Sequence, residues 1–288
     1  AWLGFPPEQE IYGNLFGNPA YFSAFLIFAI GFSALAVQRK FFNNLLLKNL
    51  FLALTLFFAV TLIFAHVRGA LIGLVLGVFL FCTLSVVFLR GEKENRKLAL
   101  FCSLLLLIGF ISILLLFVAK ETEFVRNNSY LSRVVSIADF RASDSPRERL
   151  SVWLVAFRAF KEKPLVGWGP ENFASAFNKY YDHWVGARET WFDRAHNIPL
   201  EILVNGGIFL FAFYLFWIFA VFLLIFKIAK REKILSFILA SVFFAYFLQG
   251  LFFFDTFASS LGLFPFMAYL VYLGRESGIQ NLESGRGI

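Results

Sequence analysis

Long uncharged apolar runs alternate with short charged connectors along this chain. The runs cover residues 20–38, 49–67, 69–89, 98–119, 202–226, 234–254 and 256–274. Each is close to the roughly 20 residues that an α-helix needs to cross the hydrocarbon core of a bilayer. The pattern predicts an all-α polytopic membrane protein with about seven transmembrane helices.

One long polar interruption separates the first four runs from the last three. It predicts three parts: a membrane domain at residues 1–119, a loop domain at 120–200 that holds most residues capable of chemistry, and a second membrane domain with a cytoplasmic tail at 201–288. Ahead of the first run, Pro6-Pro7 and Gly17-Asn18-Pro19 are turn signals. We expect residues 1–19 to form an outer loop or a re-entrant segment.

The basic residues indicate which side each connector faces. They gather in alternate connectors, after the first, third, fifth and seventh runs: Arg39, Lys40 and Lys48; Arg90, Lys93, Arg96 and Lys97; Lys227, Lys230, Arg231 and Lys233; and Arg275. Because cytoplasmic connectors carry the excess of lysine and arginine, this alternation places residues 1–19 and the loop domain on the extracytoplasmic side.

The loop domain contains its own helix signals. Ser145 is a candidate N-cap, Pro146 suits the first helical position, and Glu148 completes a capping box. Apolar side chains then recur at helical spacing, at Leu150, Trp153, Leu154, Phe157 and Phe160. We expect this amphipathic helix to lie flat on the outer membrane surface or against the spans.

Further boundaries follow in the loop domain. The stretch from Pro164 to Gly169 predicts a tight turn that ends the first helix. A second, weaker amphipathic helix is expected from Pro170 to about Trp184. Asn197 is a candidate N-cap for the fifth span, because Pro199 is tolerated in the first turn that follows.

Composition excludes a soluble globular chain, because 59% of the residues are hydrophobic, 16% are charged and 42 are phenylalanine. The net charge of +7 alone suggests a nucleic-acid partner, but the basic residues lie in connectors, as orientation signals do, so none is predicted. Cys82 and Cys102 lie within apolar runs, which argues against a disulfide or a metal site. Since the chain starts at Ala1 and its single methionine is Met267, we expect a fragment or a processed form.

Three arginines are candidates for binding an anionic substrate. Arg68 begins the third run at the end assigned to the outer side, against both the positive-inside bias and the helix dipole. It either snorkels to lipid headgroups or binds phosphate, which a guanidinium pairs with in a bidentate way. Arg147 and Arg149 occupy the first turn of the loop helix, and Arg149 borders the edge formed by Trp153. Arg149 is therefore either a solvated surface residue or an inward-pointing functional one.

His196 immediately precedes the candidate N-cap Asn197. The positive end of a helix dipole disfavours imidazolium, so a neutral imidazole is expected near pH 7. A neutral histidine can act as the general base for a hydroxyl acceptor, and Asp193 is available to orient the ring. The alternative is a structural histidine that hydrogen-bonds a backbone carbonyl.

Several other classes of protein are disfavoured. No pair of histidines has metal-ligand spacing, and the sequence has no phosphate-binding loop, dinucleotide-binding turn or serine nucleophile elbow, so neither a metal nor a cofactor is predicted. Proton-coupled transporters usually need carboxylates inside the membrane, yet no acidic residue lies near the middle of a predicted span. Nor does the sequence indicate the cation-lined spans or helices broken near the midplane that a flippase would need.

Short motifs distributed along the chain resemble the O-antigen ligase family, which includes lipopolysaccharide O-antigen ligases, related polysaccharide polymerases and bacterial O-linked oligosaccharyltransferases. The motifs are Gly17-Asn18-Pro19 before a span, Arg68-Gly69-Ala70 opening another, Glu148-Arg149 with Trp153, Pro164 through Gly169, and His196-Asn197 before a span. Their order, together with the large outer loop, carries the match over residues 17–207. Val67 departs from the pattern, since many members carry a small polar residue there. Members usually have more spans, so the resemblance implies that several N-terminal helices are absent here.

The resemblance implies a GT-C-like fold and a metal-independent, inverting transfer of a glycan from undecaprenyl diphosphate to an acceptor hydroxyl. The reaction would take place at the outer face of the bacterial cytoplasmic membrane, with a glycan, a lipid or a protein as acceptor. Carried over by position, Arg68 and Arg149 match the family's diphosphate-binding arginines, His196 its proposed base, and Asn197 the residue beside that base. Arg147 and Trp153 complete the predicted substrate-binding set.

Other functions stay open at this point. A lipid-linked polysaccharide polymerase of the same fold differs only in its acceptor, and a polysaccharide transporter or flippase belongs to a different class. A purely structural membrane subunit leaves Arg68, Arg149 and His196 unexplained. Nothing in the sequence identifies the acceptor, the glycan or the oligomeric state.

Overall fold

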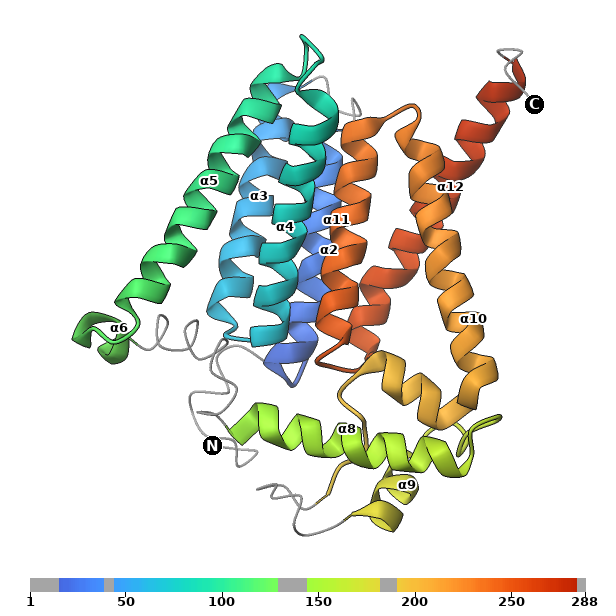
Figure 1. The fold of residues 1–288 in the computed structure, drawn as a ribbon. Helices are drawn as coiled ribbons and strands as arrows, with labels where there is room; N and C mark the ends of the chain where they lie inside the picture. The colour runs from blue at the N-terminus through green and yellow to red at the C-terminus, as the bar shows by residue number, and fades with distance from the viewer. Residues whose placement is uncertain (1–15, 39–43, 129–143, 182–190, 284–288) are drawn as a thin grey trace. The chain divides into compact units, whose positions relative to one another are not determined.

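The computed structural model describes residues 16–38, 44–128, 144–181 and 191–283, and every regular element within these ranges is a helix (Figure 1). Seven helices there are long and apolar enough to cross a membrane: α2 (Pro19–Gln38), α3 (Leu45–Phe64), α4 (Arg68–Leu89), α5 (Arg96–Ala119), α10 (Ile198–Ala229), α11 (Lys233–Gly250) and α12 (Phe257–Glu283). The expected all-α polytopic membrane protein is confirmed. The turn signal at Pro6-Pro7 lies outside the described residues, whereas Asn18 accepts a hydrogen bond from the Ala20 N–H at 2.8 Å and so caps α2.

The chain forms two compact units. The bundle unit comprises residues 1–81 and 215–288, and the loop unit comprises residues 82–214. Helices α4 and α10 each contribute one part to either unit. The three parts predicted from the sequence, with boundaries at residues 119/120 and 200/201, were defined by the location of the candidate functional residues. They differ from these compact units and stay a prediction.

Helix α2 is the centre of the bundle unit, where it packs against α3, α11 and α12 (Figure 1). Its Phe28 is fully buried and lies 5.8 Å, between ring centroids, from Phe266 of α12. Phe243 of α11 stacks on the same Phe266 ring at 6.4 Å. Most of α3 instead exposes large apolar side chains, as expected for a helix that faces lipid.

A glycine stripe brings α4 close to α11 within the bundle unit. A Cβ on Gly73 would lie 2.6 Å from the Ala245 carbonyl oxygen, and one on Gly77 would lie 3.0 Å from that of Ser241. Such small residues allow two membrane helices to approach backbone to backbone. The contact fixes the end of α4 that carries Arg68 beside the C-terminal end of α11, since a Cβ on the adjacent Gly69 would lie 3.2 Å from the Phe252 side chain.

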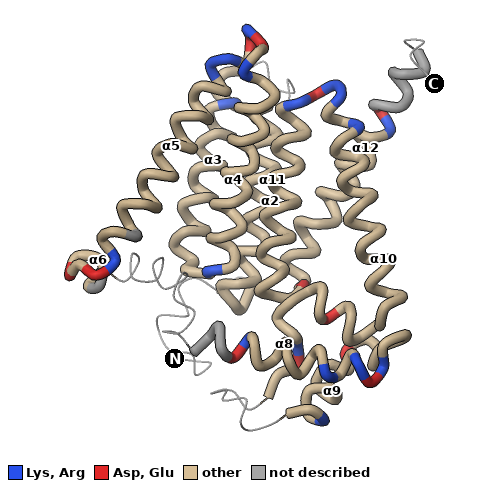
Figure 2. The backbone as a smooth tube through the Cα atoms, in the orientation of Figure 1, with Lys and Arg blue, Asp and Glu red and all other residues tan. Residues whose placement is uncertain are grey.

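The charged residues of the bundle unit lie at the ends of its helices (Figure 2). The basic connector at residues 227–233 joins α10 to the N-terminal end of α11. Arg68 lies at the opposite end of α11. This arrangement agrees with alternation of the connectors across a membrane, while the side that each end faces stays a prediction.

Three shorter helices belong to the loop unit: α6 (Glu123–Asn127), α8 (Asp144–Glu162) and α9 (Phe173–Tyr180). Helix α8 begins at Asp144, one residue before the predicted N-cap Ser145. Pro146 then occupies the third helical position, where its missing N–H still removes no intrahelical hydrogen bond. Helix α9 is shorter than the predicted second helix, and Trp184 lies outside the described residues.

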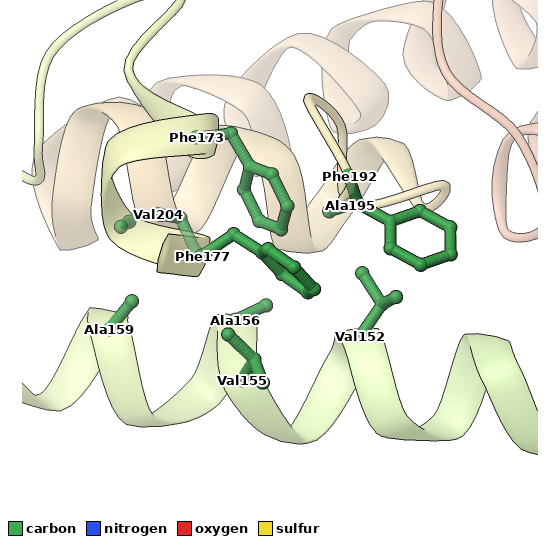
Figure 3. Packing of buried hydrophobic residues seen from close by; sticks show 10 residues of the cluster. Val152, Val155, Ala156, Ala159, Phe173, Phe177, Phe192, Ala195 and Val204 are labelled. Atoms are coloured by element: carbon green, nitrogen blue, oxygen red, sulfur yellow. The ribbon is translucent and has the colours of Figure 1, made fainter. Parts of the chain in front are cut away.

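The face of α8 that packs into the core of the loop unit is not the apolar face identified from the sequence. Leu150 and Phe157 belong to the face identified from the sequence, which was expected to lie on the outer membrane surface or against the spans, and both are exposed. The buried face carries the small residues Val152, Val155, Ala156 and Ala159 (Figure 3). Phe173 and Phe177 of α9, together with Phe192, pack over this face. Small side chains on α8 leave room for these three rings, because a protein core is packed to a fixed density.

Helix α10 is broken at Gly207, whose φ of 66° and ψ of −164° are not helical. The break leaves backbone carbonyls of the first part and N–H groups of the second part without intrahelical partners. The turn at residues 164–169 satisfies both sets. The N–H groups of Trp168 and Gly169 donate to the carbonyls of Val204 and Asn205 at 2.9 and 2.8 Å, and the Ile208 N–H donates to the Pro164 carbonyl at 2.8 Å.

This break corrects the expectation of uninterrupted spans. It lies nine residues after the start of a 32-residue helix, within the first third of its length. The predicted tight turn is the segment that fills it. Gly167 and Gly207 both have positive φ, and a Cβ on Gly207 would lie 2.3 Å from the Leu165 carbonyl oxygen. Only glycine fits this contact, because a side chain would meet both a strained backbone and a clash.

Replacing Gly207 with alanine should therefore destabilise the protein. The backbone conformation alone costs about 1–3 kcal/mol for a residue with a Cβ, and the clash with the Leu165 carbonyl adds to it. The measurement is the midpoint of thermal unfolding in detergent micelles. Gly109→Ala is the matched control, because Gly109 lies in α5 with open space around it and should gain about 0.5–1 kcal/mol. A Gly207→Ala midpoint at or above that of the unsubstituted protein would contradict the account.

Candidate active site

The segment Arg194–Asn197 approaches α10 in the loop unit and is held on two sides at Ala195. On one side, the indole N–H of Trp153 in α8 donates to the Ala195 carbonyl at 3.1 Å. On the other, the Ala195 N–H donates to Oε2 of Glu201 in α10 at 3.0 Å. Both backbone groups of Ala195 are thus tied to neighbouring helices, which fixes the backbone that leads into His196.

Glu201 anchors this segment through a second contact. It is buried, and its Oε1 accepts from the Arg194 guanidinium at 2.8 Å. Arg194 also pairs with Glu171, which lies just before α9, at 2.5 Å. A buried carboxylate is retained only when it is paired and hydrogen-bonded, as this one is. Arg194 and Glu201 are positioning residues that the sequence analysis missed. Their spacing of seven residues across a helix start gives no local signal of contact.

His196 is half-buried and adopts a left-handed backbone conformation, with a φ of 50°. Its ring meets the edge of the Phe192 ring, with centroids 5.8 Å apart and planes at 87°. A non-glycine residue with positive φ is uncommon, and such strain persists only where the surrounding contacts hold it. Here the contacts at Ala195 and the helix start at Ile198 hold it.

The pKa of His196 is lowered to about 4, first because burial disfavours the charged imidazolium and second because the positive charge of Arg149 lies nearby. The exposed Asp193 carboxylate raises this pKa, but by less than the other two effects lower it. The imidazole is therefore neutral at pH 7, as expected from the sequence, although burial and Arg149 are causes that the sequence did not reveal. Orientation of the ring by Asp193 stays a prediction.

Asn197 caps α10 as expected, because its Oδ1 accepts from the Leu200 N–H at 2.9 Å. It is buried, and Pro199 lies in the first turn that follows. The cap fixes where the helix starts, and so fixes the backbone of the preceding histidine.

The structure brings four of the predicted site residues together in the loop unit: Arg149, Trp153, His196 and Asn197. Arg149 is half-buried on the edge of α8 that also carries Trp153. Arg147 lies in the first turn of α8, but its side chain is outside the described residues. Arg68 belongs to the bundle unit, at the start of α4.

A neutral imidazole beside a guanidinium pairs a proton acceptor with an anion-binding group. Within the described ranges, no group of three or more His, Cys, Asp or Glu side chains is arranged to hold a metal ion. Trp191, five residues before His196, is 56% exposed. In contrast, Lys163 already lies over the Trp168 ring, at 4.1 Å from its centroid.

Comparison with known protein families gives a match over the region that holds the predicted site residues. A family model described as O-antigen ligase matches residues 51–215, which is more than half of the 288 residues. The match includes all six predicted site residues, from Arg68 to Asn197. No curated protein matches the sequence.

Titration of His196 should show both causes of its lowered pKa. We expect a midpoint near 4 by NMR of the histidine-labelled protein, with the resonance assigned from its loss in His196→Gln. Arg149→Gln removes a nearby positive charge and should raise the midpoint, but not to the ordinary 6.5, because burial remains. Arg158→Gln alters an exposed residue of the same helix and should leave the midpoint unchanged. A midpoint of 6 to 7 in the unsubstituted protein would show that the imidazole is solvated.

Proposed function

Since the chain belongs to the O-antigen ligase family, we propose that it transfers a glycan from undecaprenyl diphosphate to an acceptor hydroxyl at the outer face of the bacterial cytoplasmic membrane. Family membership supports glycosyl transfer of the ligase or polymerase type by an integral membrane protein, with a lipid-linked glycan and an acceptor as partners. The observation that carries the finer proposal is the neutral His196 beside Arg149.

His196 is the general base in this proposal. Its neutral imidazole takes the proton from the acceptor hydroxyl as that oxygen attacks the anomeric carbon of the donor. The bond between the anomeric carbon and the diphosphate oxygen breaks, and its electron pair leaves with the diphosphate. Attack opposite to the leaving group inverts the configuration at the anomeric carbon. The proton on the imidazole then passes to solvent.

Arg149 binds the diphosphate, and this changes the basicity of His196. In the free protein the guanidinium charge helps to lower the pKa of the imidazole to about 4, which makes it a weak base. A bound diphosphate brings negative charge to Arg149 and offsets that effect. The pKa of His196 therefore rises when the donor is in place, which is the moment at which a base is needed.

Arg68 is the second diphosphate ligand in this proposal. Two guanidinium groups neutralise the charge that develops on the leaving group, which is the task of a divalent metal in many other transferases. Close packing of the α4 glycines against α11 fixes the backbone that carries Arg68. Arg147 adds positive charge at the start of α8, while Trp153 and Asn197 hold the segment that carries the base.

A polymerase would use the same donor chemistry with a growing glycan as its acceptor, and the acceptor alone distinguishes it from a ligase. A flippase would move the lipid-linked glycan without releasing the diphosphate. Release of undecaprenyl diphosphate therefore separates transfer of either kind from transport.

We expect the full chain, reconstituted in lipid, to release undecaprenyl diphosphate from a lipid-linked oligosaccharide in chelator with a broad mixture of acceptors. His196→Ala, Arg149→Ala and Arg68→Ala should each slow release by at least about 100-fold, the usual range for loss of a general base or of a charge-stabilising group. Arg158→Ala, an exposed arginine on the same helix as Arg149, is the matched control and should behave as the unsubstituted protein. Full turnover by either Arg68→Ala or Arg149→Ala would refute its role at the diphosphate.

The pH dependence should show the change in basicity on donor binding. The acid limb of kcat/KM reports the free protein, so it should fall only below about pH 4 to 5, as the imidazole gains its proton. The acid limb of kcat reports the donor complex and should lie at higher pH, because the diphosphate offsets the Arg149 charge. Initial rates from pH 4 to 8 at limiting and saturating donor measure both. Coincident limbs would show that donor binding does not affect the base.

A further inference from the structure

Helix α8 has a second apolar face, opposite the one buried in the loop unit. Leu150, Leu154 and Phe157 are 49%, 60% and 46% exposed, and their spacing of four and three residues aligns them in one stripe. The buried face at Val152, Val155, Ala156 and Ala159 lies on the other side of the helix. The exposed stripe therefore lies outside the buried cluster of the loop unit.

The turn after α8 extends this apolar surface. Leu165 and Val166 are 59% and 71% exposed. The turn is hydrogen-bonded to the break in α10, where the Ile208 N–H donates to the Pro164 carbonyl at 2.8 Å. Ile208 and Phe209, which begin the second part of α10, are themselves 44% and 59% exposed.

These contacts make the surface continuous with that of a membrane-spanning helix. The exposed side chains of α10 from Ile208 to Phe226 are apolar, and in a helix of this length and composition they contact lipid. The turn at Leu165 and Val166 therefore lies at the level where α10 enters the hydrocarbon. Lysines accompany it, since Lys161 lies over the Phe157 ring at 4.7 Å and Lys163 is exposed. In helices that lie in the interface of an anionic bilayer, lysine methylene groups typically cover apolar surface while the ammonium group reaches the lipid headgroups.

We propose that this surface, the lipid stripe formed by Leu150, Leu154, Phe157, Leu165 and Val166, is inserted into the bilayer, so that α8 lies in the membrane interface. Lipid covers its outward face, and α9 covers its inward face. Arg149 precedes the first residue of the lipid stripe and lies near His196. Insertion therefore places both at the level of lipid phosphate groups, and a benefit for a lipid diphosphate donor rests on the function proposed above.

The test measures what touches each side of α8. Nitroxide labels are attached at Phe157→Cys and at Arg158→Cys in the full chain, reconstituted in vesicles that contain anionic lipid. These neighbours lie about 100° apart around the helix. Collision rates with oxygen, which concentrates in lipid, and with a water-soluble nickel chelate are measured by electron paramagnetic resonance. Leu154→Cys gives a second position on the lipid stripe, and the unsubstituted protein measures background labelling of the buried Cys82 and Cys102.

We expect the ratio of oxygen to nickel collisions to be several-fold higher at positions 154 and 157 than at 158. Equal, nickel-dominated collisions at all three positions would show that the stripe faces water and would overturn the proposal. Low collision rates with both reagents at 154 and 157 would also overturn it, because protein would then cover the stripe. No donor or acceptor is present, so failure of glycosyl transfer would leave this result intact and remove only the functional consequence of insertion.

Discussion

The loop unit depends on one interruption in a membrane helix. Where α10 breaks at Gly207, carbonyls and N–H groups of the backbone lose their helical partners, and in an apolar setting each lost partner costs several kcal/mol. The turn at residues 164–169 supplies partners on both sides of the break, so backbone hydrogen bonds fix the end of α8 to α10 in addition to the side-chain packing at Val204. Glycine at 167 and 207 makes the approach possible. Because the first part of α10 carries Glu201 and the Asn197 cap, the same contact sets the distance between α8 and the segment that holds His196.

The candidate site places opposite electrostatic demands close together. Glu201 is buried and needs a cation, which Arg194 supplies, while His196 is kept neutral by burial and by a different cation, Arg149. The first pair holds the backbone, and the second pair is the one proposed to act on the acceptor hydroxyl and the diphosphate. In the proposed mechanism, this separation allows one short segment to hold its backbone rigidly and to present the general base. Its backbone is tied at Ala195 to Trp153 and Glu201, whereas the imidazole one residue later is engaged by an aromatic edge and by charge at a distance.

Helix α8 is apolar on two sides, and the proposed insertion uses the second side to link the candidate site to the membrane. Its small residues face α9, and its large ones face outward. In water, an exposed stripe of leucine and phenylalanine would favour association, whereas at a bilayer interface it is stabilised by lipid. A reaction on a lipid diphosphate needs its base and its cations at the level of the headgroups. With α8 inserted as proposed, Arg149 lies at that level.

The sequence by itself determined the seven spans, the turn at residues 164–169, the cap at Asn197 and the identity of Arg149 and His196 as candidates, since each depends on local periodicity, turn chemistry or charge near a helix end. Only the tertiary structure decided which face of α8 is buried, because both faces are apolar and the choice rests on whether rings from α9 fit over them. It alone joined Arg194 to Glu201 and lowered the pKa of His196 through Arg149, which is 47 positions away in the chain. It also showed that α10 is broken at Gly207. The backbone groups exposed by that break form hydrogen bonds with a turn about forty residues earlier in the chain. Contacts between residues distant in sequence leave no periodic signal, so they become visible only once the chain has folded.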